Sequence, residues 1–160
     1  MNKTKDFVVI CDGLRSLHNV GSVFRTSDGV GMSKIYLCGI TGMPDTQKHE
    51  RQISKVALGA QNYIPWEYAK QSWRVVEKLK KEGYQIVSLE QTENSILYTK
   101  FKPKFPLAFV IGNENKGVKK SVLSRSDVVI EIPMTGTKKS LNVSVAFGIA
   151  AYWISGFNRK

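Results

Sequence analysis

Five consecutive apolar residues, Leu107 to Ile111, set the tightest limit on the fold of this chain. A strand with no polar residue to face water is typical of the middle of a parallel sheet, where both faces are covered. Further short apolar runs that predict strands cover residues 7–11, 35–38, 85–89 and 128–132. Because such runs recur along the chain, we expect one sheet with this segment near its centre.

Helical patterns separate these runs. Predicted helices cover residues 19–28, 53–60, 71–81 and 118–123, and a last helix begins near Asn142. Gly29 and Gly31 are expected to end the first helix, and Gly83 to cap the third. Residues 39–50 and 99–106 are expected to be loops. Strands that alternate with helices predict an α/β domain with a mostly parallel sheet flanked by helices.

The length of the chain indicates how many domains it forms, and its charge indicates what kind of partner it binds. The chain has 160 residues, of which 42% are hydrophobic, so we expect a single domain over residues 1–160. The net charge is +11, and residues 100–160 hold eleven Lys and Arg against three acids. That concentration favours a polyanionic partner. Solubilising charge on exposed helices remains the alternative.

The sequence does not favour a membrane protein or a metal-binding protein. No apolar run is long enough for a bilayer and no signal peptide precedes Phe7, which predicts a cytoplasmic protein. Cys11 and Cys38 lie in separate apolar segments, so buried free thiols are favoured over a disulfide. His18 and His49 have no partners at ligand spacing, so no metal site is expected.

Two glycine patterns resemble nucleotide-binding loops but are incomplete. Gly112 to Gly117 has GxxxxG spacing after a strand, yet Val118-Lys119 follows where a P-loop has Lys and Ser or Thr. Gly29-Val-Gly31 is followed by Lys34 at the last glycine position of GxGxxG. Both an NTPase and a dinucleotide-binding protein are therefore disfavoured.

Polar residues in unexpected places are the candidates for chemistry. Glu114 follows the central strand, either as a functional group or as an N-cap partner for the helix near Val118. Arg25 lies within the first helix, where it is either functional or simply solvated. The polar loop Thr135 to Asn142 either caps the last helix or binds a ligand.

Three stretches together resemble the SpoU (TrmH-type) RNA 2′-O-ribose methyltransferases of the SPOUT superfamily. Residues 19–26, Asn-Val-Gly-Ser-Val-Phe-Arg-Thr, resemble motif 1. Residues 109–117, Phe-Val-Ile-Gly-Asn-Glu-Asn-Lys-Gly, are similar to motif 2, and residues 132–136 with 140–146 to motif 3. Residues 55–60 also resemble the family. The likeness extends over about residues 7–157.

The resemblance implies a fold and an activity. It implies a single SPOUT domain with a C-terminal deep trefoil knot, an exception to the rule that chains do not knot. It also implies S-adenosylmethionine as methyl donor, a ribose 2′-hydroxyl of RNA as acceptor, and a homodimer packed through the C-terminal helix. We expect tRNA as substrate, with rRNA or a non-catalytic RNA-binding role as alternatives. No added N-terminal RNA-binding domain is expected in residues 1–160.

The resemblance also implies site residues. Cofactor contacts are expected from Leu89, Glu90, Gly112, Ile132, Met134 and Leu141. The catalytic group is expected to comprise Asn19, Arg25, Glu114, Ser140 and Asn142, and RNA contacts are expected from Arg25, Lys116, Lys119 and Lys120. Glycine at 112 would let the cofactor approach the backbone. An arginine is a poor base because its pKa exceeds ~12, so Arg25 either takes the hydroxyl proton or orients phosphate and hydroxyl.

Overall fold

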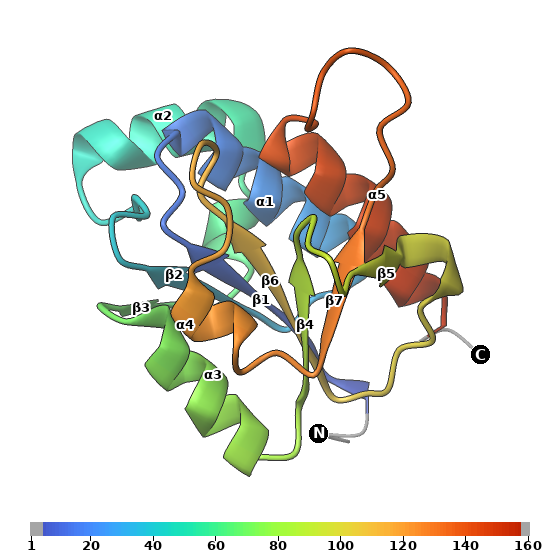
Figure 1. Ribbon diagram of the computed structural model, residues 1–160. Coiled ribbons are helices and arrows are strands. Elements are labelled where there is room, and N and C mark those ends of the chain that lie inside the picture. The colour runs from blue at the N-terminus through green and yellow to red at the C-terminus, as the bar shows by residue number, and fades with distance from the viewer. Residues whose placement is uncertain (1–4, 158–160) are drawn as a thin grey trace.

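The computed structural model describes residues 5–157, which form one seven-stranded parallel sheet with helices on both faces (Figure 1). The strand order is β3-β2-β1-β6-β4-β7-β5. The strands are β1 (Phe7–Asp12), β2 (Lys34–Cys38), β3 (Trp66–Ala69), β4 (Gln85–Leu89), β5 (Ile96–Leu97), β6 (Leu107–Gly112) and β7 (Val128–Glu131). The helices are α1 (Leu17–Val30), α2 (Gln47–Ala57), α3 (Ser72–Lys81), α4 (Lys120–Leu123) and α5 (Val143–Gly156), with short 3-10 turns η2 (Ala60–Asn62) and η3 (Tyr98–Lys100).

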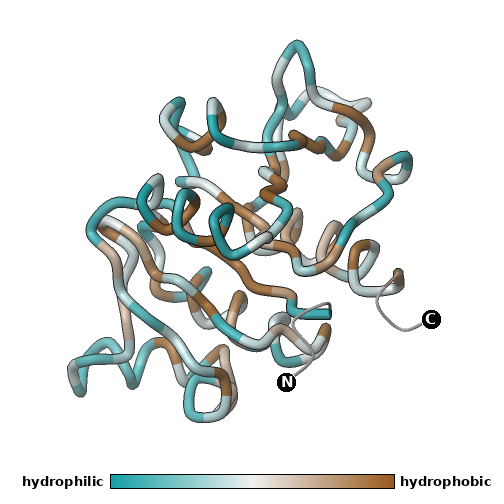
Figure 2. Tube along the Cα trace, turned by 90° about the horizontal axis from the view of Figure 1, so that it is seen from below, coloured by the Kyte–Doolittle hydropathy of each residue, from teal (hydrophilic) through white to brown (hydrophobic). Residues whose placement is uncertain are grey.

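Two hydrophobic cores lie on the two faces of the sheet. Along β1, Val9 and Cys11 belong to the core under α1, α2 and α5, whereas Val8 and Ile10 belong to the core under α3 and α4. This alternation follows from the two-residue period of a strand. Every residue of β6 is buried, because β6 lies between β1 and β4 in the middle of the sheet. In Figure 2 the hydrophobic colour accordingly concentrates in the inner strands. The predicted α/β class with a mostly parallel, helix-flanked sheet is confirmed.

The sequence prediction missed both edge strands. β3 is only partly buried, and β5 has two residues, so neither shows a run of apolar side chains. Edge strands are short and half solvated, which removes the pattern that marks a central strand.

Several predicted helix boundaries were wrong. The polar loop expected to reach residue 50 ends at Thr46, whose hydroxyl accepts from the His49 N–H and begins α2. Only Ile53 and Ala57 of α2 are buried, so most of its sequence looked like loop. α2 stops at Ala57 rather than 60, α4 starts at 120 rather than 118, and α1 continues past residue 29. Gly31, in the left-handed conformation at φ 77°, caps α1.

Both cysteines are free and buried, as the sequence favoured. β1 and β2 are neighbours, but Cys11 and Cys38 point into opposite cores and cannot meet. Burial raises the pKa of Cys38 to about 12, and burial likewise raises the pKa of Cys11. Within residues 5–157, no helix combines the length and hydropathy needed to cross a bilayer.

Thiol reactivity tests this burial. In the native protein at about pH 8, near the ordinary thiol pKa of ~8.5, iodoacetamide is expected to leave both cysteines unmodified. In denaturant both should react, because unfolding removes the desolvation that suppresses the thiolate. Mass spectrometry of the two samples measures the difference. Rapid native alkylation of either residue would contradict the two-core arrangement.

Candidate functional site

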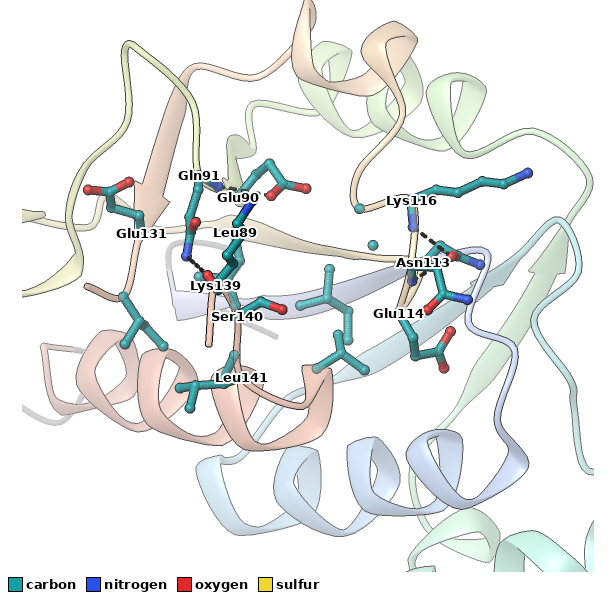
Figure 3. A pocket seen from close by; sticks show the side chains of 17 residues that line it. Leu89, Glu90, Gln91, Asn113, Glu114, Lys116, Glu131, Lys139, Ser140 and Leu141 are labelled. Atoms are coloured by element: carbon teal, nitrogen blue, oxygen red, sulfur yellow. Dashed lines mark hydrogen bonds between the residues drawn. The ribbon is translucent and has the colours of Figure 1, made fainter. Parts of the chain in front are cut away.

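The cavity that most of the predicted site residues line, which we name the main cavity, lies at the carboxyl ends of β4, β6 and β7 and has a volume of about 340 Å³ (Figure 3). Its walls are formed by residues 89–91 at the end of β4, 111–117 at the end of β6, 131–132 at the end of β7, and 139–141 with Val143 and Ala146 at the start of α5. In parallel sheets, ligands bind beyond the carboxyl ends of the strands. A volume in this range is typical of small-molecule sites.

The loop after β6 is closed by its own hydrogen bonds. The Asn113 N–H donates to the Gly117 carbonyl at 3.1 Å, and the Gly117 N–H donates back at 2.9 Å. Asn113 Oδ1 accepts from the N–H groups of Asn115 and Lys116, while its Nδ2 donates to the Gly13 carbonyl at 2.8 Å. Asn113 therefore fixes both the shape of this loop and its attachment to the end of β1.

Gly112 is required by the loop itself. A Cβ at this position would collide with the backbone of Gly117 and Val118. The expectation that glycine serves the approach of a ligand here therefore gives only part of the reason. The main steric demand comes from the protein backbone, which turns back on itself within five residues.

Side chains from the end of β4 join the loops around the cavity. Glu90 Oε2 accepts from the Val118 N–H at 2.9 Å, and its Oε1 accepts from the Gln91 N–H at 2.9 Å. Gln91 Nε2 donates to the Lys139 carbonyl at 2.9 Å. These bonds connect β4, the loop after β6 and the loop before α5, so the three walls are positioned together.

Glu114 caps α1. Its carboxylate accepts from the backbone N–H groups of Arg15 and Ser16 and from Asn19 Nδ2, at 2.9–3.1 Å. The alternative that Glu114 caps the helix near Val118 was wrong, because the carboxylate points to α1 instead. Burial by itself would raise the pKa of Glu114, but the bonds from Asn19 and from the two backbone groups outweigh it, so the pKa is lowered.

Asn19 connects two of the predicted catalytic residues. Its Nδ2 donates to Glu114 at 3.0 Å, and its Oδ1 accepts from Asn142 Nδ2 at 3.4 Å. Asn142 is also the N-cap of α5, because its Oδ1 accepts from the N–H groups of Ser144 and Val145. The polar loop before α5 therefore caps the helix and also lines the cavity, with Ser140 and Leu141 in its wall.

Arg25 does not line the main cavity. It is exposed on α1, about 9 Å further along the helix than Asn19 and about 120° away around it. The other four predicted catalytic residues do gather: Glu114 and Ser140 line the cavity, and Asn19 and Asn142 lie behind Glu114.

Some of the residues predicted to bind the cofactor or RNA line the main cavity, and others lie outside it. Leu89, Glu90, Gly112, Ile132 and Leu141 line the main cavity. Met134 lines a second hollow of about 440 Å³ that shares Gln91, Glu131, Ile132 and Lys139 with the first. Lys116 lies at the rim, with its side chain extending away from the other labelled residues (Figure 3). Lys119 Nζ is 3.8 Å from Asp12, and Lys120 is exposed at the start of α4.

Sequence reasoning missed Asn113 and Gln91 as site residues. Asn113 had a usable signal, because an asparagine directly after a buried strand and a glycine is suited to turn geometry. Gln91 had none, since its partner is a backbone carbonyl 48 positions away. With apolar Leu89, Ile132 and Leu141 beside backbone polar groups, the cavity suits an organic ligand that has an apolar body and a polar edge.

Comparisons with known proteins agree with this arrangement. A candidate TrmH family tRNA/rRNA methyltransferase of Staphylococcus saprophyticus is 37% identical over 145 residues, and one of Staphylococcus haemolyticus is 34% identical. Each match covers 91% of this chain and 56% of the relative, so the chain spans just over half the length of these relatives.

Solved structures show the same fold. The Aquifex aeolicus protein, "A. aeolicus TrmH/SpoU tRNA modifying enzyme", superposes with a TM-score of 0.85 at 28% identity, over 98% of this chain and 77% of that one. An AdoMet-bound rRNA methyltransferase from Sinorhizobium meliloti gives 0.82 at 25% identity, over 92% and 55%. The sequence model of the SpoU rRNA Methylase family matches residues 6–152, and the chain therefore belongs to that family.

Proposed function

We propose that the protein transfers a methyl group from S-adenosylmethionine to a ribose 2′-hydroxyl of RNA. The observation that carries the proposal is the main cavity, where the segments resembling motifs 2 and 3 form the walls and motif 1 is joined to them through Asn19. The Sinorhizobium relative that shares this fold was solved with AdoMet bound, which supports the choice of cofactor.

The lining residues fit that cofactor. Leu89, Ile132 and Leu141 offer apolar surface, and the strand ends offer backbone donors and acceptors for a purine edge. Glu90 and Gly112 shape the floor of the cavity, and Met134 lines the adjoining hollow. When bound, S-adenosylmethionine supplies a methyl group activated by a sulfonium.

Cofactor binding tests the proposal. Isothermal calorimetry is expected to show that S-adenosylmethionine and its demethylated product bind without RNA and with EDTA present. ATP is expected to bind much more weakly, because the loop after β6 lacks the lysine of a P-loop. No binding, or binding that needs a divalent cation, would contradict the proposed site.

The remaining polar groups have different proposed roles toward the ribose 2′-hydroxyl. Ser140 is exposed in the cavity wall, so its hydroxyl is available to the ribose. Glu114 already accepts from Arg15, Ser16 and Asn19, so it acts as a positioning residue that holds the start of α1. Asn142 positions α5 in the same way. Arg25 either takes the proton or orients phosphate and hydroxyl.

A homodimer through α5 would explain why Arg25 lies away from the main cavity of its own subunit. Val145, Ile149 and Tyr152 are exposed apolar residues on one face of α5. Tyr152 contacts α1 at Gly29, one turn after Arg25 on the same side of that helix. Pairing two α5 helices therefore puts Arg25 at the subunit boundary, and we propose that it serves the cavity of the partner subunit.

A charge introduced into this face tests the dimer. Ile149→Glu is expected to yield monomers in analytical ultracentrifugation, because it buries a charge in the proposed contact. The folded monomer should keep its circular dichroism, since Ile149 is 38% exposed within the subunit. Ile96→Glu on β5 is the matched control, with 41% exposure and no expected effect. A dimer that survives Ile149→Glu would place the contact elsewhere.

We also propose that the C-terminal segment forms a deep trefoil knot. A deep trefoil knot agrees with a C-terminal segment that passes Gln91 at Lys139 and then packs as α5 against α1. A crystal structure tracing the chain past the loop after β4 tests it. We propose tRNA as the substrate, because this chain is 28% identical to the A. aeolicus tRNA modifying enzyme. A tRNA substrate implies that the protein acts in the cytoplasm. Lys116, Lys119 and Lys120 contribute contacts to the phosphates of the RNA.

A further inference from the structure

A row of cations lies along the outer side of α3. Arg74, Lys78 and Lys81 are exposed and spaced four and then three positions apart, so they share one side of the helix over about 10 Å. The other side of α3 carries Val75, Val76 and Leu79, which are buried against the sheet. We name Arg74, Lys78 and Lys81 the α3 row.

Two acids close to the row in sequence or packing, Glu77 and Asp127, have partners of their own. Glu77 Oε1 accepts from Arg125 Nε at 3.0 Å. Asp127 accepts from the Ile86 N–H at 2.7 Å and lies 3.3 Å from Lys80 Nζ. These carboxylates hold α3 to the segment after α4 rather than neutralising the row.

The row forms no ion pair within residues 5–157, although Glu67 interacts electrostatically with Lys78. Within residues 5–157, no carboxylate oxygen lies within 4.0 Å of the α3 row or of Lys120. Arg74 lies 5.2 Å from the ring centroid of Trp73, a contact that leaves its N–H groups able to bind an anion. Several unpaired cations on one side make a local positive potential.

Helix stability alone does not explain the row. Lys78 and Lys81 lie in the last turn of α3, where positive charge is favourable to the helix dipole. Arg74 lies in the first turn, where positive charge is unfavourable. The helix dipole therefore does not account for Arg74, which is exposed and contacts the ring of Trp73.

The chain leads from the rim of the main cavity to α4, the helix that packs against α3. From Lys116 at the rim the chain passes Lys119 and enters α4 at Lys120, and α4 packs against α3. Arg125, just after α4, lies 5.0 Å from the ring of Trp73 on α3. Figure 1 shows α3 and α4 side by side on the sheet face opposite α1, α2 and α5.

We propose that the α3 row, together with Lys120, binds phosphates of the substrate RNA away from the methylated nucleotide. The inference rests on the proposed function, and it names a second contact surface for the same substrate. Charge complementarity selects RNA, because a polyanion with regularly spaced phosphates matches several cations in a row. Such contacts give affinity and orientation without base choice.

Matched triple variants test the surface. Arg74→Gln/Lys78→Gln/Lys81→Gln removes the row, and Lys48→Gln/Arg51→Gln/Lys55→Gln removes the same charge from exposed positions on α2, in the opposite layer. The row set removes two last-turn cations and the α2 set removes one, so circular dichroism of both variants checks that each protein stays helical. Fluorescence titrations with bulk tRNA and with a labelled oligouridylate at several salt concentrations measure affinity.

The row variant is expected to bind more weakly, with a flatter plot of log affinity against log salt. Each phosphate contact contributes about 0.7 to the slope for a single strand, so three lost contacts flatten it by roughly 2. The α2 variant should keep the parent slope. An unchanged slope in the row variant, or equal losses in both variants, would overturn the proposal.

Cofactor calorimetry on the same samples separates this inference from the proposed function. Both variants are expected to bind S-adenosylmethionine like the parent, since neither set lines the main cavity. If the parent fails to bind S-adenosylmethionine, the proposed function fails while the salt slopes still decide the RNA surface. If the parent and both variants bind the cofactor but their salt slopes for RNA do not differ, the proposed role of the α3 row is wrong and the proposed function still stands.

Discussion

Arg25→Ala is expected to lower methyl transfer by roughly 10²–10⁴, the usual contribution of a positioned acid–base group. The side chain is exposed on α1 and does not line the main cavity, so cofactor affinity should remain at the parent value. Folding should also be kept, because exposed substitutions usually change stability by less than about 0.5 kcal/mol. A loss of turnover without a loss of binding indicates an interaction made in the transition state.

Two companion variants sharpen this result. Arg25→Lys keeps the charge but not the planar fork of donors, so it separates phosphate attraction from bidentate orientation. Arg51→Ala, at an exposed position on α2, is the matched control for removing an arginine from a helix surface. Single-turnover assays with tritiated S-adenosylmethionine measure all three. Turnover near the parent rate in Arg25→Ala would make this arginine an ordinary surface residue.

Gly112→Ala is expected to distort the loop after β6 and with it the main cavity. The added Cβ meets the backbone of Gly117 and Val118. That backbone cannot yield easily, because Asn113 and Glu90 hold it through hydrogen bonds at 2.9–3.1 Å. Overpacking of this kind costs about 1–3 kcal/mol. If cofactor binding must restore the native loop, the affinity falls roughly 5- to 150-fold.

Calorimetry and thermal denaturation measure the two parts of this effect. Gly136→Ala is the control, because a Cβ there meets no atom within 4 Å and the residue has no positive φ. We expect the control to keep its melting temperature, and Gly112→Ala to melt lower. Parent-like affinity and melting in Gly112→Ala would show that the loop adapts, and the steric account of this glycine would be wrong.

Local patterns determined the fold class. Leu107 to Ile111 is apolar throughout, and the strand it predicted is the buried centre of the sheet. The edge strand Trp66–Ala69 escaped prediction because half of its surface is solvated and no apolar run marks it. The first part of α2, residues 47–52, escaped for a related reason, since none of these residues is buried.

The sequence by itself predicted the stretches at 109–117 and 132–146, which contribute residues to the main cavity, and the stretch at 19–26, which does not line it. It did not determine which groups touch. Glu114 and Asn19 are 95 positions apart, and Asn19 and Asn142 are 123 apart, so only the folded sheet brings them together. Tertiary structure likewise showed that Gly112 serves the backbone and that Arg25 lies away from the main cavity. Contacts between distant segments depend on how strands and helices pack, and periodicity along the chain carries no record of that packing.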